Sequence, residues 1–230
     1  MISINLAATL IGLGLGYLFR NKLNNGFWQA FAWIVTREPV RDWLICRSFL
    51  TPYEHITSAD GKDVYMYRWW LFNPYPFGKQ SEGGGGYIKW LPSIRIHQIM
   101  RPDMDRHLHS HPWNARTIIL DGWYQEERPG KVSSDGMFTA EPGCVGVTYP
   151  SNAKSASEVR AVYMRRQGHT GTLKFGEYHR ISQVSPGGVF TMFITDKFQG
   201  DWAFDVDGVA VPHDEYLSKM KDSMAQGAQA

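Results

Sequence analysis

The stretch of sequence that decides the fold lies mid-chain and reads RHLHSHPWNARTIILDGWY, residues 106–124. Histidines occupy alternate positions within it, at His107, His109 and His111. Alternate residues of an extended strand face the same side, so the three imidazoles could point into one cavity. Imidazoles two residues apart on a strand can converge on one metal ion. The pattern favours a metal site, although an isolated pair of this kind is also a common surface feature.

A second stretch, GHTGTLKFGEYHRISQ at residues 168–183, has a spacing that complements the first. The two stretches resemble the paired motifs of the cupin superfamily, HxHx3Ex6G and Gx5PxGx2Hx3N. The matched positions are His109, His111, Ala115 and Gly122, followed by Gly168, Lys174, Gly176, His179 and Gln183. Three positions depart from the motifs: Ala115 replaces the glutamate, Lys174 the proline and Gln183 the asparagine.

This resemblance implies a fold and a set of metal ligands. The implied fold is all-β, a cupin double-stranded β-helix or jelly-roll barrel. In metal-binding cupins the motif histidines face into the barrel, which makes His109, His111 and His179 the expected ligands. Because Ala115 cannot supply the usual carboxylate, the expected site resembles the three-histidine iron sites of thiol and diketone dioxygenases. Fe(II) is the expected cofactor, with Zn, Ni, Cu or Mn as alternatives.

A closer resemblance, to an uncharacterised cupin-like family of phage and bacterial proteins, covers more of the chain. It rests on the segments YRWWLF, IRIH, DRHLHSHPWNARTIILDGWYQEE, GEYHRI and FTMFITDKFQGDWAFDVDG. That family has no histidine at the position of His107, and it brings in Arg68 and His97 as candidate catalytic residues. Arg68 is either a clamp for a substrate carboxylate or phosphate, or a structural residue that forms a buried ion pair or faces the sheet edge. His97 is either a group that meets the substrate or a hydrogen-bonded core histidine.

Beyond residue 50 the chain reads as a series of short strands rich in β-branched and aromatic residues. The expected strands are Val64–Phe72, Ser93–Met100, Thr117–Leu120, Val159–Met164, Thr170–Phe175 and Val189–Thr195. Turns that contain glycine or proline separate them. The pattern predicts one antiparallel barrel of about six to eight strands over residues 51–216. Trp202 and Phe204 are expected to close one end of it by apolar burial.

Two charged features beside the motifs have alternative interpretations. Glu126 could replace the missing carboxylate ligand, but a glutamate that follows a tight turn is more often a solvated strand end. Arg165 and Arg166 form a small basic cluster next to Gly168. We expect this cluster at a solvated hairpin tip.

The two ends of the chain differ from the barrel in composition. Within residues 1–25, Ile2–Phe19 carries no charge, and Arg20 and Lys22 follow it directly. A bilayer core needs about 20 apolar residues, so this helix is expected to anchor the protein at the cytoplasmic face of a membrane. The alternative is a cytoplasmic protein whose apolar helix packs on its own domain. Residues 26–50 are expected to form a helical connector, and residues 217–230 a polar tail or frayed helix.

Composition and charge exclude several classes of protein. The chain has 230 residues, of which 43% are hydrophobic and 20% charged, as in a globular protein with a large core. A formal charge of +2 argues against a nucleic acid partner. The two cysteines, Cys46 and Cys144, cannot form a disulfide framework or a multi-cysteine zinc site. The sequence also has no P-loop, dinucleotide-binding glycine pattern or Ser-His-Asp order.

Two functions follow from these observations. The first is a metal-dependent enzyme, an Fe(II)-type oxygenase that acts on a small-molecule substrate. The second is a non-catalytic cupin, a ligand-sensing or assembly module held at a membrane. A metal-free isomerase with a histidine base fits less well, because neither motif supplies a carboxylate partner. Gly12 and Gly16 could let two N-terminal helices pack closely, so a homo-oligomer stays open.

Overall fold

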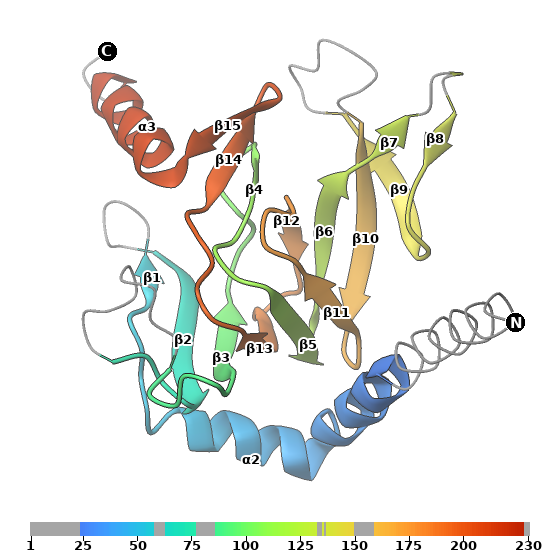
Figure 1. The fold of residues 1–230 in the computed structure, drawn as a ribbon, viewed down its shortest axis with the longest axis vertical. Helices are drawn as coiled ribbons and strands as arrows, with labels where there is room; N and C mark the ends of the chain where they lie inside the picture. Colours follow the sequence, from blue (N-terminus) through green and yellow to red (C-terminus); the bar gives the residue numbers. More distant parts are fainter. Residues whose placement is uncertain are drawn as a thin grey trace, which may run out of the picture.

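The computed structural model describes residues 24–57, 63–76, 86–132, 135, 137–149 and 159–227, with side chains up to residue 220. Within this part of the chain the strands form four sheets, and all strand pairs are antiparallel (Figure 1). The predicted all-β jelly-roll fold class, with helices before the barrel, is confirmed.

The two larger sheets form the walls of the barrel. The six-stranded large sheet has the order β1 (Ile56–Thr57), β2 (Val64–Phe72), β3 (Ser93–Ile99), β13 (Val189–Thr195), β5 (Ala115–Asp121) and β11 (Thr170–Leu173). The four-stranded small sheet has the order β12 (Arg180–Val184), β6 (Trp123–Pro129), β10 (Arg160–Arg166) and β9 (Cys144–Thr148). Strands β2 and β13 have the predicted bounds. Strands β3 and β11 end earlier than predicted, β5 extends further at both ends, and β10 is shifted toward the C-terminus.

Shorter strands complete the architecture. They are β15 (Val209–Pro212), β14 (Ala203–Val206) and β4 (Leu108–His109), which form one sheet, and β7 (Lys131–Val132) with β8 (Phe138–Thr139), which form another. Helix α3 (His213–Gly227) follows β15. The predicted count of six to eight barrel strands is too low, since the two larger sheets contain ten of the fifteen described strands. Four of the fifteen are only two residues long and depend on a partner strand, which local sequence does not reveal.

The N-terminal helices cover the outer face of the large sheet (Figure 1). One helix covers residues 24–35, and α2 (Glu38–Ser48) follows it, with a proline in its first turn. Ala32, Val35 and Leu44 pack in one cluster with buried residues of β3, β5 and β13, among them Ile96 and Ile118. This apolar contact holds the residues before the barrel against its wall.

The opposite face of the large sheet points into the barrel. Strand side chains alternate, so Ile94 and Ile96 of β3 pack toward the helices, whereas Arg95 and His97 point the other way. A second apolar cluster joins the two sheets across the interior, and its buried members are Ile99, Ile119, Tyr124, Ile181 and Val189. Polar side chains on this interior face are therefore shielded by both sheets.

Gly122, the last residue of the first motif, connects β5 to β6. Its φ is +77°, in the region that favours glycine. A Cβ atom at this position would lie 2.6 Å from Oγ of Ser185 and 2.9 Å from the carbonyl oxygen of Gly188. The motif therefore needs glycine here for backbone conformation and for close packing.

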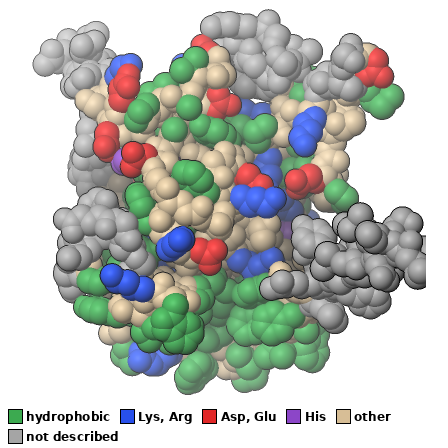
Figure 2. Space-filling model, in the orientation of Figure 1, with side chains coloured by type: hydrophobic (Ala, Val, Ile, Leu, Met, Phe, Trp, Pro, Cys, Tyr) green, Lys and Arg blue, Asp and Glu red, His purple; other side chains and the backbone are tan. Residues whose placement is uncertain are grey.

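Six large apolar side chains of the N-terminal helices and the turn after them are exposed; we call them the N-terminal apolar face. They are Phe27, Trp33, Ile34, Trp43, Phe49 and Leu50. Hydrophobic side chains gather at the corresponding end of the molecule in Figure 2. The expected anchor Ile2–Phe19 lies outside the described residues. No helix within the described ranges is long and apolar enough to span a bilayer.

Candidate metal centre

His109, His111 and His179 lie together inside the barrel. The backbones of His109 and His179 pair directly, because each N–H donates to the other's carbonyl oxygen at 2.9 Å. One ring nitrogen from each histidine falls within a group whose members lie within 4.8 Å of one another. The closest pair, Nε2 of His111 and Nε2 of His179, is 2.9 Å apart. The structure thus brings together the three histidines that the motif spacing predicts as ligands.

His107 does not join this group, although strand alternation had placed it on the same face. The strand that carries the first motif, β4, is only Leu108–His109, so regular alternation does not extend back to His107. Nδ1 of His107 lies 2.8 Å from the hydroxyl oxygen of Tyr216 on α3. The prediction that His107 shares the face of the triad is therefore wrong.

Glu126 of β6 controls the orientation of His179. Nδ1 of His179 donates to Oε1 of Glu126 at 2.9 Å, so Nε2 is the nitrogen that faces the other two histidines and bonds Nε2 of His111. The same carboxylate accepts from Nη2 of Arg128 at 3.1 Å and from Nε of Arg165 at 2.8 Å. A carboxylate on the far nitrogen of a ligating histidine fixes the tautomer and the ring. Glu126 therefore fixes the ring of His179, in contrast to both interpretations of the sequence.

Arg165 also departs from its sequence-based interpretation. It was expected at a solvated hairpin tip, but its side chain is only 12% exposed and its guanidinium is bound to Glu126. Arg166, the next residue, is exposed as expected. Burial alone would raise the pKa of Glu126, but the hydrogen bond and charge of His179 and the charges of Arg128 and Arg165 hold it well below its usual range. Glu126 is therefore a carboxylate at neutral pH.

A second carboxylate, that of Asp103, lies near Nδ1 of His109, and no sequence pattern indicates it. Its Oδ2 lies 3.9 Å from Nδ1 of His109 and accepts the backbone N–H of Ile181 at 2.7 Å. The hydroxyl of Tyr65 donates to its other oxygen. Asp103 thus links the first motif to β12 and places a negative charge near the triad.

Burial keeps two of the triad rings neutral. It lowers the pKa of His109 to about 4, with a smaller opposing effect from Asp103. It lowers the pKa of His111 well below the ordinary value, and the neighbouring histidines add to the effect. Neutral imidazole is the form that binds metal, so the site needs little proton release before it can take an ion.

The two candidate catalytic residues have different surroundings. His97 lies on the interior face of β3, 7% exposed, with its ring 5.1 Å from that of Phe193. Arg68 is its direct partner on β2, but Nε of Arg68 donates to the carbonyl oxygen of Glu54 at 2.6 Å, and its guanidinium lies 4.4 Å from the centre of the Tyr53 ring. The structure therefore places both side chains on the interior face of the large sheet, where the guanidinium of Arg68 is bound to its own hairpin.

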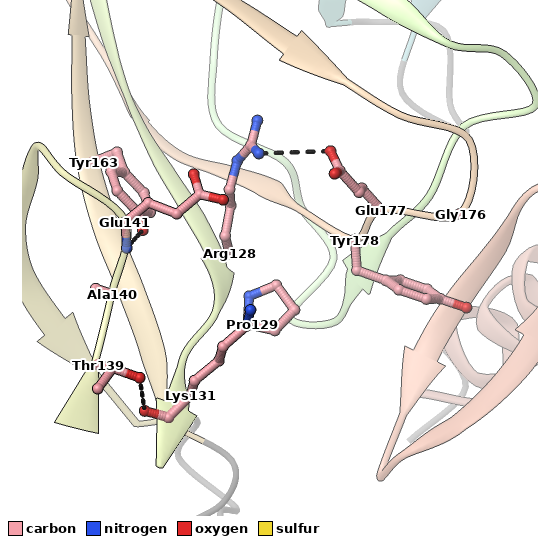
Figure 3. Close-up of a pocket in the computed structure, with 10 residues that line it drawn as sticks. All are labelled: Arg128, Pro129, Lys131, Thr139, Ala140, Glu141, Tyr163, Gly176, Glu177 and Tyr178. Carbon is pink, nitrogen blue, oxygen red and sulfur yellow. Dashed lines mark hydrogen bonds and ion pairs between the residues drawn. The ribbon is translucent and has the colours of Figure 1, made fainter. Parts of the chain in front are cut away.

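Aromatic rings lie around the triad, and a separate pocket lies beside Arg128. Trp202 and Phe204 lie 6.0 and 5.8 Å from the ring of His109, in the predicted late segment. The side chains of His109 and His179 stay 14% and 12% exposed, which leaves the site accessible. A pocket of about 530 Å³ lies beside Arg128, where Arg128 and Glu177 face each other at 3.7 Å (Figure 3). Arg128 thus connects this pocket to Glu126.

Comparison with known proteins identifies similar folds at low identity. Solved structures similar to the chain include Bacillus subtilis oxalate decarboxylase, studied for its Mn(II) centres, at 11% identity and a TM-score of 0.40 over 80% of this chain and 36% of that chain. A single-residue variant of the same enzyme matches at 11% identity and a TM-score of 0.36, over 66% of this chain and 30% of that chain. The chain thus spans about a third of the length of these structures. No protein-family model and no curated protein matches it.

Proposed function

We propose that this protein is a metal-dependent cupin in which His109, His111 and His179 hold one divalent cation. The observation that carries the proposal is the pair of Nε2 atoms 2.9 Å apart, one of which is oriented by Glu126 through Nδ1. Two nitrogens each about 2.1 Å from one ion, at a right angle, are about 3.0 Å apart. The spacing of the donors therefore fits a metal ion, and so does the carboxylate behind His179.

We further propose that the protein is an oxygenase that acts on a small molecule. Three neutral nitrogen ligands without a carboxylate favour Fe(II), Ni(II), Cu(II) or Zn(II) over harder ions. A bound Fe(II) would supply a redox-active centre with open coordination positions. The chain's own groups orient that centre: Glu126 fixes the His179 ring, and the rings of Trp113, Phe193 and Phe204 limit the access of water.

The test compares His179→Ala with His107→Ala. Both changes remove one buried or half-buried imidazole, but only His179 belongs to the triad. We expect His179→Ala to lose stoichiometric metal while its circular dichroism spectrum stays that of the wild type, and His107→Ala to keep most of the metal. The protein is purified without a chelating column, and metal content is measured by mass spectrometry after dialysis against Fe(II) or Zn(II).

Two outcomes would contradict the proposal. One is stoichiometric metal in the His179→Ala variant, and the other is no metal in anaerobically handled wild type. In either case the second function, a ligand-sensing or assembly module, becomes the better account. Oxygen consumption that depends on added Fe(II) tests the oxygenase assignment separately.

A further inference from the structure

Arg95 is a fully buried cation that has no acidic partner in the part of the chain that the structure describes. It lies on the interior face of β3 and is 1% exposed. Its one hydrogen bond to a described residue runs from Nη2 to Oγ1 of Thr195 at 3.1 Å. No carboxylate of the described residues forms an ion pair with it. A buried guanidinium is costly unless an anion or several acceptors compensate its charge.

Aromatic rings surround this guanidinium in place of acids. The centres of four rings lie 5.0–5.5 Å from its Cζ atom, those of Trp70, Tyr75, Trp113 and Phe193. Cation–π contacts of this kind attract the guanidinium but accept no hydrogen bond in its plane. The charge of Arg95 is therefore only partly compensated by the residues around it.

Three buried nitrogens near Arg95 have no hydrogen-bond partner among the described residues. They are Nε of Arg95, Nε1 of Trp113 and Nε2 of His97. Two of these, on Arg95 and Trp113, are obligatory N–H donors. Buried donors without acceptors are rare in folded proteins, and each one indicates a missing partner such as a water or a ligand.

These nitrogens adjoin the histidine triad. The ring of Trp113 stacks on that of His111, with 6.0 Å between the ring centres. The ring of Phe193 lies 6.1 Å from that of His111 and 5.1 Å from that of His97. The aromatic cage of Arg95 and the candidate metal centre therefore share two walls, Trp113 and Phe193.

We infer that Arg95 and Trp113 form a subsite that binds the carboxylate of a small organic acid whose apolar body extends along Phe193 toward His111. This inference rests on the proposed function and names its class of substrate. A carboxylate supplies the acceptors that the two N–H donors lack, and it pairs with guanidinium in a planar geometry. The aromatic walls favour an apolar body over a second charged group.

The charge balance selects a monocarboxylate. Burial, together with the charges of Arg95 and Arg68, lowers the pKa of His97 well below its ordinary value, so this ring is neutral at pH 7. The guanidinium of Arg68 is engaged by the Glu54 carbonyl and the Tyr53 ring. Arg95 is the guanidinium that the four rings of the cage surround, and a single carboxylate would neutralise the charge that they compensate only in part.

The experiment compares acids with their uncharged amides on the full-length protein. The probes are acetate, butanoate and phenylacetate, each paired with the corresponding amide, which has nearly the same size but no charge. Binding is measured by calorimetry and by the shift of the thermal midpoint, because a ligand specific for the folded state raises that midpoint. Each titration is run on metal-free and on Zn(II)-loaded protein.

Arg95→Met and Trp113→Phe are the test variants, and Arg116→Met is the matched control. Arg116 also bonds a threonine hydroxyl, that of Thr170, at 3.2 Å and lies over a tryptophan ring, that of Trp28, at 4.6 Å. It differs from Arg95 in lying on the outer face of the large sheet. We expect at least one acid to bind more tightly than its amide, at least tenfold more weakly to Arg95→Met, and several-fold more weakly to Trp113→Phe. Affinity for Arg116→Met should equal that of the wild type.

Equal binding of acids and amides, no binding by any probe, or unchanged affinity in the Arg95→Met variant would overturn the inference. Arg95 would then be a structural cation held by its rings. Arg95-dependent binding to protein that takes up no metal would support the subsite and reject the proposed function. Metal uptake without Arg95-dependent binding would do the reverse.

Discussion

Replacing Glu126 with glutamine separates its effect on the triad from its effect on stability. The change keeps the size of the side chain but removes the negative charge that Arg128, Arg165 and His179 share. Glutamine can still accept from one of these donors. It cannot compensate two guanidinium groups, and it no longer holds Nδ1 of His179 by a charge-assisted hydrogen bond.

The expected losses can be worked out from the contacts. Removing one partner of a buried ion pair lowers the free energy of unfolding by about 3–5 kcal/mol. For Glu126→Gln we expect the lower end, about 3 kcal/mol. Arg128 still has two other partners, Glu177 at 3.7 Å and the carbonyl oxygen of Thr172 at 3.1 Å. Carboxylates behind metal-ligating histidines change metal affinity by about 10–100-fold. The dissociation constant for Zn(II) should therefore rise about 10–100-fold, which is about 1.4–2.7 kcal/mol.

Glu127 offers a matched control one residue along the same strand. It is also buried and pairs with two arginines, Arg160 at 3.0 Å and Arg180 at 3.6 Å, but no hydrogen bond or ion pair of the described residues joins it to the triad. Glu127→Gln should lower the free energy of unfolding in urea by a similar amount and leave the Zn(II) dissociation constant unchanged. Equal effects of the two variants on metal affinity, or no effect of Glu126→Gln, would refute the assigned role of Glu126.

Three further predictions address pH, the surface and the backbone. The free energy of unfolding of the metal-free protein should fall between pH 7 and pH 5, because the pKa of His109 is about 4 in the folded state and about 6.5 in the unfolded chain. His109 alone should lower the free energy of unfolding by about 2 kcal/mol at pH 5. Urea denaturation curves that coincide at the two pH values would exclude this. We propose that the N-terminal apolar face binds to a bilayer surface. A variant with Trp33→Ser and Trp43→Ser should therefore co-sediment less with anionic vesicles than the wild type. Equal co-sedimentation, or a dimer in the absence of lipid, would contradict the proposal. Gly122→Ala should lower the free energy of unfolding by more than Gly143→Ala. Both glycines have a positive φ, but only a Cβ atom at Gly122 would meet other atoms within 4 Å. Equal losses in urea denaturation would show that packing at Gly122 is unimportant.

Local pattern predicted most of the long strands but missed the seven residues of β6. Val64–Phe72 and Val189–Thr195 combine β-branched and aromatic residues over a full strand length, and both match observed strands end to end. The two-residue strands could not be predicted from local sequence pattern. Leu108–His109, for example, is a strand because it pairs with Phe204 and Asp205, almost a hundred residues away. No property of the two residues themselves distinguishes them from a loop.

The same distinction explains which parts of the site could be predicted. The spacing of His109, His111 and His179 is a property of the sequence, and the structure brings these residues together. The roles of the charged residues around them depend on which strands face each other. Glu126 and Glu127 are identical neighbours in sequence, but alternation along β6 points one toward His179 and the other toward Arg160. A buried carboxylate takes its function from the cation or histidine that it meets, so only the pairing of β6 with β10 and β12 could assign one glutamate to the triad and the other to stability.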